Sequence, residues 1–217
     1  MGLNDTDAAR TGGHFLVASP YLTDGLFFRS VVLMVRHEAK GALGMVINQP
    51  NEHQLHDVIA CDTNSNSVGS AQVFTGGPVA GPLIALHDAA GLGDPCQVPV
   101  SDWSSGEFTD ASPSQMSEIN IPAWMTADED HLRMLATRHD ARVRFLVNYS
   151  GWGPGQLDAE IKAGGWLVTP ADSETVFGDH ESVWETLVRR CGRSILKQLA
   201  PETTLPHGDE KFDPGLN

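Results

Sequence analysis

The stretch from Asn148 to Glu160 contains the glycines and polar side chains best suited to chemistry in this sequence. It reads N-Y-S-G-W-G-P-G-Q-L-D-A-E, a pattern that predicts a strand, a glycine-rich turn over 151–155, and a helix. Glycines let a ligand approach the backbone, and a helix start offers unpaired N–H groups to an anion. The candidate binding residues here are Gly151, Trp152, Gly153, Gln156 and Glu160.

This loop does not match the known phosphate-binding fingerprints. A G-x-G-x-x-G pattern from Gly151 requires glycine at position 156, which is glutamine, and neither Lys nor Ser/Thr follows Gly155 as a Walker A loop requires. Asp172 lies 21 residues after Gly151, where an acid could meet a ribose, but the helix between them is short for a crossover. Two interpretations stay open: a nucleotide- or phosphometabolite-binding enzyme that uses Gly151–Gly155, and a tight turn packed around its own tryptophan and proline.

A second backbone-exposing turn, Gly76-Gly77-Pro78-Val79, follows a predicted short strand. Its simplest interpretation is a plain chain reversal. If both turns lie on one rim of the molecule, then Asn48 and the polar end of the first loop would close a small pocket with them. The candidate residues that this hypothesis adds are Asn48, Gly76 and Gly77.

Other reactive patterns are weaker. The spacing His53-x-x-His56-Asp57 would place two imidazoles on one face of a predicted helix, but no H-E-x-x-H motif accompanies it, so no metal is predicted. Ser150 precedes a glycine but lacks the glycine two residues earlier that a nucleophile elbow needs. We therefore predict no catalytic residue and no cofactor from these patterns.

The elements that must position these residues predict an α+β domain. Short branched apolar runs predict strands, and the predicted strands are 14–18, 30–37, 42–48, 71–75, 82–87, 117–121, 142–149 and 166–169. Apolar residues at helical spacing predict helices over 52–60, 128–139, 156–163 and 181–199. Glu38-Ala39-Lys40-Gly41 predicts a hairpin turn. Residues 62–70 predict a surface loop, and residues 91–114 predict weak strands joined by long loops. A strand-rich, mainly antiparallel or mixed sheet flanked by helices follows from this order.

The charge balance limits the partners of this chain. Its 217 residues carry 14 Lys and Arg against 28 Asp and Glu, a net charge of −14 that disfavours phosphate backbones and anionic membranes. The longest apolar run, Val31–Val35, is far shorter than the roughly 20 residues of a membrane span. Three distant cysteines and an acidic N-terminus without an apolar signal region predict a cytoplasmic protein. We expect one compact domain over 12–200, a flexible N-terminus over 1–11 and a loosely held tail over 201–217.

Several blocks of the sequence together resemble the AlgH/YqgE family of bacterial conserved hypothetical proteins. The blocks that carry the resemblance are G-H-F-L-V-A-S-P at 13–20, Asp24 with Phe27, 30–35, G-A-L-G-M-V-I-N-Q-P at 41–50, 76–79, Leu86-His87, and G-W-G-P-G-Q-L-x-x-E at 151–160 with Trp166. The resemblance spans about residues 12 to 190 and implies a single-domain, strand-rich α+β protein of the bacterial cytoplasm. The family takes one name from a proposed transcriptional regulator of alginate production, and no catalytic residue set or cofactor is established for it.

The family name and the lack of a catalytic constellation favour a non-catalytic regulatory or ligand-binding protein that acts through protein or small-molecule contacts. Direct DNA binding is disfavoured, because no helix-turn-helix with a basic second helix is recognisable. The main basic cluster is Arg189, Arg190, Arg193 and Lys197 on the last predicted helix. Its plainer interpretation is a solvated face that pairs with nearby acids such as Glu185.

Overall fold

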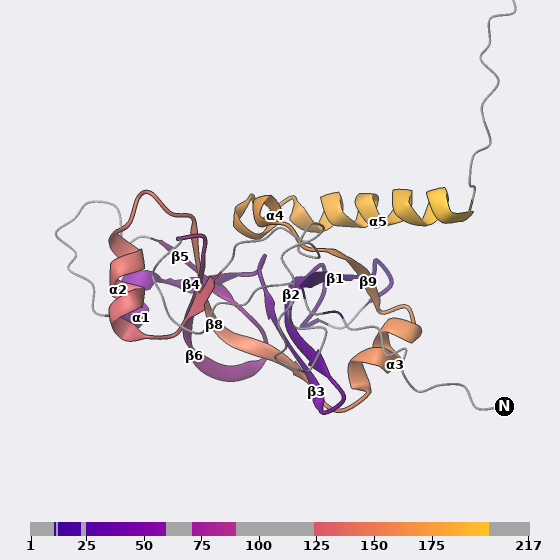
Figure 1. Ribbon diagram of the computed structural model, residues 1–217, viewed down its shortest axis with the longest axis horizontal. Coiled ribbons are helices and arrows are strands. Elements are labelled where there is room, and N and C mark those ends of the chain that lie inside the picture. Colours follow the sequence, from indigo (N-terminus) through magenta and orange to yellow (C-terminus); the bar gives the residue numbers. More distant parts are fainter. Residues whose placement is uncertain (1–10, 12, 23–24, 60–70, 90–123, 200–217) are drawn as a thin grey trace, which may run out of the picture.

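The computed structural model describes residues 11, 13–22, 25–59, 71–89 and 124–199, with side chains as far as residue 193. Nine strands of this part of the chain form one mixed sheet (Figure 1). They are β1 (His14–Ala18), β2 (Val31–Glu38), β3 (Gly41–Val46), β4 (Pro50–Gln54), β5 (Gln72–Thr75), β6 (Val79–His87), β7 (Trp124–Thr126), β8 (Val143–Trp152) and β9 (Trp166–Pro170). The order is β4-β5-β8-β3-β2-β1-β9, and β6 pairs with β7 and β8.

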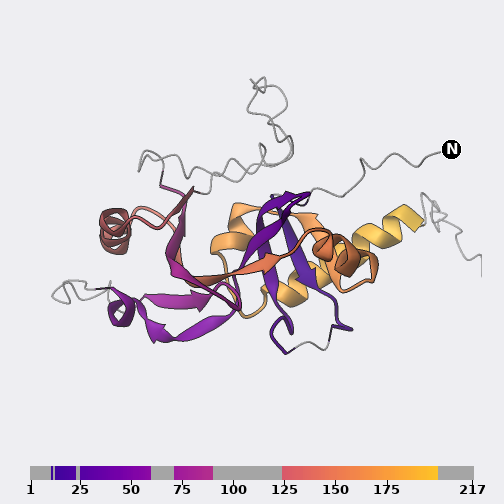
Figure 2. The same ribbon diagram turned by 90° about the horizontal axis from the view of Figure 1, so that it is seen from below.

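Five helices of the described residues lie against this sheet. They are α1 (Leu55–Val58), α2 (Glu129–Thr137), α3 (Gln156–Lys162), α4 (Ser173–Phe177) and α5 (Val183–Leu199). In Figure 1, α4 and α5 run along one side of the β1–β2–β9 end, α3 lies at the bottom of that end, and α1 and α2 lie at the opposite end of the molecule. Figure 2 shows β8 running from the part that carries α2 to the part that carries α3. The predicted single α+β domain is confirmed.

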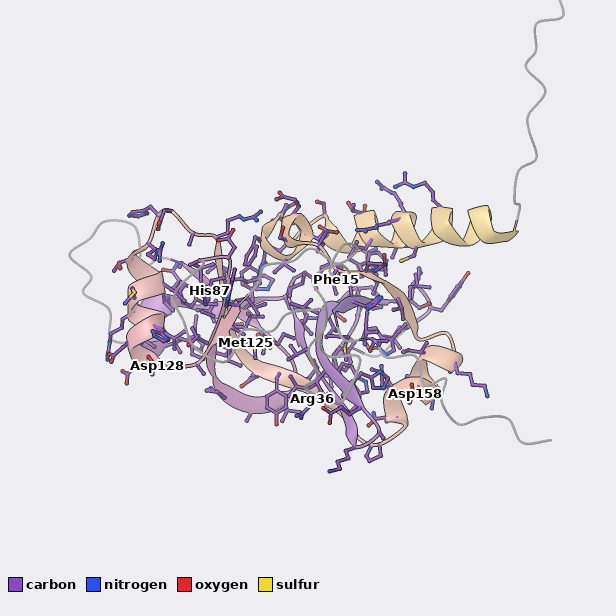
Figure 3. All side chains as sticks on the ribbon, viewed as in Figure 1. Phe15, Arg36, His87, Met125, Asp128 and Asp158 are labelled. Carbon is purple, nitrogen blue, oxygen red and sulfur yellow. The ribbon has the colours of Figure 1, made fainter. Side chains whose placement is uncertain are left out.

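The central strands are apolar throughout because both of their faces are covered. On β1, Phe15 and Val17 pack in the cluster that α4 and α5 close, whereas Leu16 and Ala18 pack in the cluster that α3 closes. Phe15 lies in the middle of the side chains beneath the helical layer (Figure 3). A strand buried on both faces reads as a continuous apolar run instead of an alternating one. A third cluster, built around Leu55 and Phe145, lies under α1 and α2.

The glycines at 76 and 77 let the chain cross over β8. β5 and β6 both pair with residues 145–147 of β8, parallel and antiparallel respectively, so they occupy its two opposite edges. The segment between them must pass over β8, where a Cβ on Gly77 would lie 2.3 Å from the Ser150 hydroxyl oxygen and 2.4 Å from the Tyr149 carbonyl. Gly77 also has φ +153°, which side chains rarely adopt. The simplest interpretation of Gly76-Gly77-Pro78-Val79 was a plain chain reversal. In the structure this turn instead carries the chain across β8.

The structure corrects three element boundaries. Residues 50–54 form a strand because they pair with β5, so the predicted helix over 52–60 is reduced to α1. The Gln54 N–H donates a hydrogen bond to the Asp57 carboxylate, which caps the start of α1 at Leu55. Gly151 lies inside β8, paired with Leu43, so the turn covers 153–155 only. Helix α4 was not predicted, although Asp172 caps it by accepting a bond from the Thr175 N–H.

Other sequence expectations fall where the structure gives no description. The strand at 117–121, the loops at 62–70 and 91–114, Cys61 and Cys96, and nearly all of both terminal segments lie outside the described residues. The hairpin at 38–41 is confirmed, with Glu38 opposite Gly41, and Gly41 takes the positive φ that the turn needs. Within the described residues, no helix is long and apolar enough to cross a membrane.

Two basic side chains are buried on neighbouring strands. Arg144 on β8 donates to the carbonyls of Ile47 (2.6 Å) and Gly178 (2.7 Å) and lies over the Phe74 ring, 4.4 Å from its centroid. Burial lowers the pKa of Arg144 to about 10, so it stays charged at neutral pH. His87 on β6, labelled in Figure 3, is the second. It is buried and stacks on Trp124, and its Nδ1 atom makes no hydrogen bond with the described residues.

The crossing predicts a large difference between two glycine substitutions. Gly77→Ala should lower the free energy of unfolding by about 3 kcal/mol or more, because the new methyl group meets backbone and the positive φ is strained. Gly155→Ala is the matched control, since Gly155 has φ +68° but open space around its Cβ position, and it should cost only about 1 kcal/mol. Urea unfolding measures both; equal losses would contradict the crossing.

His87 predicts a pH dependence of stability. Burial lowers its pKa below the usual 6.5, helped by His131 and Arg138 and opposed by Asp88. The unfolded chain therefore binds a proton at this residue more readily, so stability falls as pH drops below about 6.5 and is unaffected above it. His87→Phe, which can still stack on Trp124, should flatten this fall in urea unfolding between about pH 7.5 and 5.5. Substitution of exposed His53 by Gln is the control; an unchanged slope in His87→Phe would contradict the burial argument.

Candidate functional site

The turn that leads into β2 presents Arg29 in an unusual backbone conformation. The Ser30 N–H and hydroxyl both donate to the Phe27 carbonyl, at 3.0 and 2.9 Å. This closes the turn and leaves Arg29 at φ +53°, a left-handed conformation that costs a non-glycine residue about 1 kcal/mol or more. A strained residue of this kind persists only where its surroundings hold it, and such residues cluster at binding sites.

The segment after β3 holds this turn in place. Asn48 accepts a hydrogen bond from the Val31 N–H (2.8 Å) through Oδ1 and donates to the Arg29 carbonyl (2.9 Å) through Nδ2. Gln49 donates to the Leu26 carbonyl at 3.3 Å. Both polar atoms of the Asn48 amide are thus used on the backbone that flanks Arg29. The N-Q-P end of the predicted G-A-L-G-M-V-I-N-Q-P block therefore shapes this turn.

An open cleft of about 520 Å³ lies between this turn and the start of α5. Its lining residues are Phe28, Arg29, Asn48, Gln49, Pro50, His180, Glu181, Trp184 and Glu185. The Arg29 guanidinium carbon lies 5.4 Å from the centroid of Phe28 and 5.0 Å from that of Trp184, which is cation–π distance. Arg29 forms no ion pair with any described residue. A cation stacked between two rings without a carboxylate suits an incoming anionic group.

The other wall of the cleft carries acidic side chains. Asp179 accepts bonds from the Glu181 N–H, the Ser182 N–H and the Ser182 hydroxyl, and these bonds lower the pKa of Asp179. They also occupy N–H groups at the start of α5, so the helix end is not free for an anion. Glu185 pairs with Arg189 at 3.3 Å. The Trp184 indole donates to the Ala18 carbonyl at 2.8 Å, which ties this wall to β1.

The predicted G-W-G-P-G-Q-L-x-x-E loop forms a structural cluster instead of an open cradle. Glu160 accepts hydrogen bonds through Oε2 from the indoles of Trp152 (3.0 Å) and Trp166 (2.8 Å), which are 6% and 4% exposed. Gln156 donates to the other Glu160 oxygen and accepts from the Gly153 N–H. Phe27 packs against both indoles. The polar groups that a ligand would use are occupied by one another.

The eight candidate binding residues therefore fall into three places. Trp152, Gly153, Gln156 and Glu160 meet in the cluster beside α3, with Gly151 just before it in β8. Gly76 and Gly77 lie at the crossing of β8, and Asn48 lines the cleft. Arg29, Glu181 and Trp184 were not predicted, because a left-handed arginine and the approach of α5 to the β1–β2 turn leave no local sequence signal.

A series of polar side chains that was not predicted from the sequence joins Thr11 to α3 through His37. The Thr11 hydroxyl lies 3.1 Å from His37 Nδ1, and His37 Nε2 lies 3.5 Å from an Asp158 carboxylate oxygen. A hydroxyl, an imidazole and a carboxylate in series resemble a nucleophilic relay. Thr11, however, is only 1% exposed, and its N–H also points at His37. The series Thr11–His37–Asp158 therefore has a structural role.

The histidine pair considered for a metal does not share a helix face. His53 lies in β4 and His56 in α1, because the helix begins only at Leu55. No group of three or more metal-ligating side chains is placed together within the described residues. Asp172, considered as a ribose partner, caps α4 and pairs with Arg190 at 2.7 Å. Burial raises the pKa of Asp172, but the hydrogen bonds from Thr175 and Arg190 outweigh burial, so the pKa is lowered.

Comparisons with known proteins agree on one family for this chain. The AlgH-like family, DUF179, matches residues 15–196, and the chain belongs to this family. A UPF0301 protein of Myxococcus xanthus is 34% identical over 181 residues, covering 82% of this chain and 88% of that protein. A UPF0301 protein of Thermobifida fusca is also 34% identical, over 212 residues and 94% of both chains. The resemblance seen in the sequence blocks is confirmed.

Two solved structures share the fold. The solution structure of the AlgH protein from Pseudomonas aeruginosa has a TM-score of 0.63 at 24% identity, covering 93% of this chain and 98% of that one. A crystal structure of a Corynebacterium diphtheriae protein has a TM-score of 0.56 at 22% identity, covering 88% and 90%. At these identities the likeness concerns the fold alone.

The Glu160 cluster predicts a stability loss. Glu160→Ala removes the acceptor of two buried indole N–H groups and should lower the free energy of unfolding by about 3 kcal/mol. Glu160→Gln keeps a carbonyl acceptor and should lose about 1 kcal/mol. Urea unfolding followed by tryptophan fluorescence measures both, with exposed Glu38→Ala as the control. A Glu160→Ala protein as stable as the control variant would show that the cluster is not structural.

Proposed function

We propose that this chain is a non-catalytic binding protein of the AlgH-like family whose ligand enters the cleft beside Arg29. One observation carries the proposal: a strained arginine without an ionic partner is held between two aromatic rings at the edge of a cleft. Within the described residues the Arg29 guanidinium forms no ion pair, so an ion pair does not explain why the strained backbone is kept. A cleft of about 520 Å³ is within the range that small ligands occupy.

A regulatory role through small-molecule or protein contacts fits this proposal better than direct DNA binding. The basic cluster on α5 is partly neutralised, since Arg189 pairs with Glu185 and Arg190 with Asp172. The net charge of −14 repels a phosphate backbone as a whole. We therefore propose a cytoplasmic regulator or ligand carrier whose partner is a small molecule or a protein.

The alternative of a nucleotide-binding enzyme at Gly151–Gly155 has less support. The Gly153 N–H is bound by Gln156, and the Glu160 carboxylate places a negative charge beside the loop. Helix α3 has seven residues, so its dipole is short. A phosphate would have to displace these contacts and approach a carboxylate.

The cleft predicts ligand binding that depends on Arg29. Benzoate, phenyl phosphate and L-phenylalanine, each of which contains a negatively charged group and a phenyl ring, are tested by thermal shift on the full chain. A ligand at 100 times its Kd stabilises the folded protein by about 2.7 kcal/mol. The shift should be lost in Arg29→Gly, which keeps the fold because glycine relieves the left-handed strain.

The matched control is Arg193→Gln, which removes an exposed arginine of α5 and should leave the shift unchanged. Arg29→Gly itself should differ from the parent by no more than about 1 kcal/mol in urea unfolding. If all three compounds fail, or if each shifts Arg29→Gly as much as the parent, then the cleft is not the binding site.

A further inference from the structure

The free charges that face the cleft are of both signs. Arg29 contributes a guanidinium from the turn before β2, and Glu181 contributes a carboxylate from the segment before α5. Within the described part of the chain neither forms an ion pair, with the other or with any third residue. The cleft thus keeps one cation and one anion apart and unneutralised.

The remaining polar groups around the cleft are already engaged. Glu185 is bound by Arg189, Asp179 holds the start of α5, and both polar atoms of Asn48 are bonded to the backbone. His180 packs edge-on against the Phe74 ring, with centroids 5.1 Å apart. Arg29 and Glu181 are therefore the charged groups most available to a ligand.

Apolar side chains also line the cleft that these two charges face. They are Phe28, Pro50 and Trp184, and Phe28 is 54% exposed. An apolar side chain placed there would cover these rings. The space is sufficient for a molecule the size of an amino acid or a dipeptide.

We infer that the cleft recognises a zwitterion with an apolar side chain, an α-amino acid by chemical class. The carboxylate pairs with the Arg29 guanidinium, a geometry that arginine favours because its fork offers two parallel N–H donors. The ammonium group faces the Glu181 carboxylate, and the side chain packs on Phe28 and Trp184. This inference rests on the proposed binding function of the cleft and names its ligand class.

The overall charge of the protein supports a zwitterion over a simple anion. A net charge of −14 repels an approaching monoanion, whereas a neutral zwitterion meets no such barrier. Glu181 and Glu185 on the far wall would further oppose a ligand that carried only negative charge. A compensating ammonium group removes that cost.

The experiment separates the two charges of the ligand. L-phenylalanine, N-acetyl-L-phenylalanine and L-phenylalanine amide are titrated into the full chain by calorimetry; the second has only the carboxylate and the third only the ammonium. The free amino acid should bind at least tenfold more tightly than either blocked form. Arg29→Gln and Glu181→Gln should each weaken the free amino acid at least tenfold, and exposed Glu38→Gln should have no effect.

The variants also predict which preference disappears. Glu181→Gln should bind the N-acetyl form as well as the free amino acid, because the ammonium has lost its partner. Arg29→Gln should treat the amide and the free amino acid alike. If the parent protein binds the N-acetyl form or benzoate as tightly as phenylalanine, the zwitterion inference is wrong and the cleft remains an anion site. If no compound binds, both the inference and the proposed function fail.

Discussion

The fold depends on one strand that must satisfy three neighbours at once. β8 pairs with β5 and β6 on its two edges and, further along, with β3. The connection from β5 to β6 therefore has to pass over it, and only residues without a Cβ fit between the crossing chain and the backbone at Tyr149 and Ser150. The same strand carries Arg144, whose guanidinium joins the end of β3 to the segment after α4. β8 therefore contacts its neighbouring strands in the sheet, the β5–β6 crossing and the segment after α4.

Two charged side chains lie on opposite faces of the sheet, Arg144 buried and Glu160 half-buried. Arg144 lies on the face of α4 and α5, where its donors satisfy backbone carbonyls and its charge rests on the Phe74 ring. Glu160 lies on the face of α3, where it receives the indole protons of Trp152 and Trp166. Charged groups are costly to bury unless hydrogen bonds surround them. The conspicuous motif around Gly153 is thus explained by packing, and the cleft with a free cation lies elsewhere, at the Arg29 turn.

Local patterns in the sequence predicted what local physics decides. The apolar runs at 14–18 and 31–35, the hairpin at 38–41 and the start of α3 at Gln156 depend on neighbours in the chain, and they are found where they were expected. The helix expected over 52–60 failed because pairing with β5 outweighed its apolar spacing. The cleft could not be predicted, since it brings together residues about 19 and 150 positions apart, and the φ of Arg29 is held by Asn48 from the segment after β3. The predicted pocket residues were consequently spread over three sites.

The insertion of β8 between β5 and β6 has a consequence for the order in which this chain can fold. β5 and β6 follow one another directly, yet they cannot pair with each other, since the strand that belongs between them is made only after residue 143. During synthesis on the ribosome each of the two strands keeps an unpaired edge while residues 88–142 emerge. Non-local pairing of this kind slows folding and exposes edges to aggregation. A net charge of −14 makes copies of the chain repel one another, which opposes such aggregation.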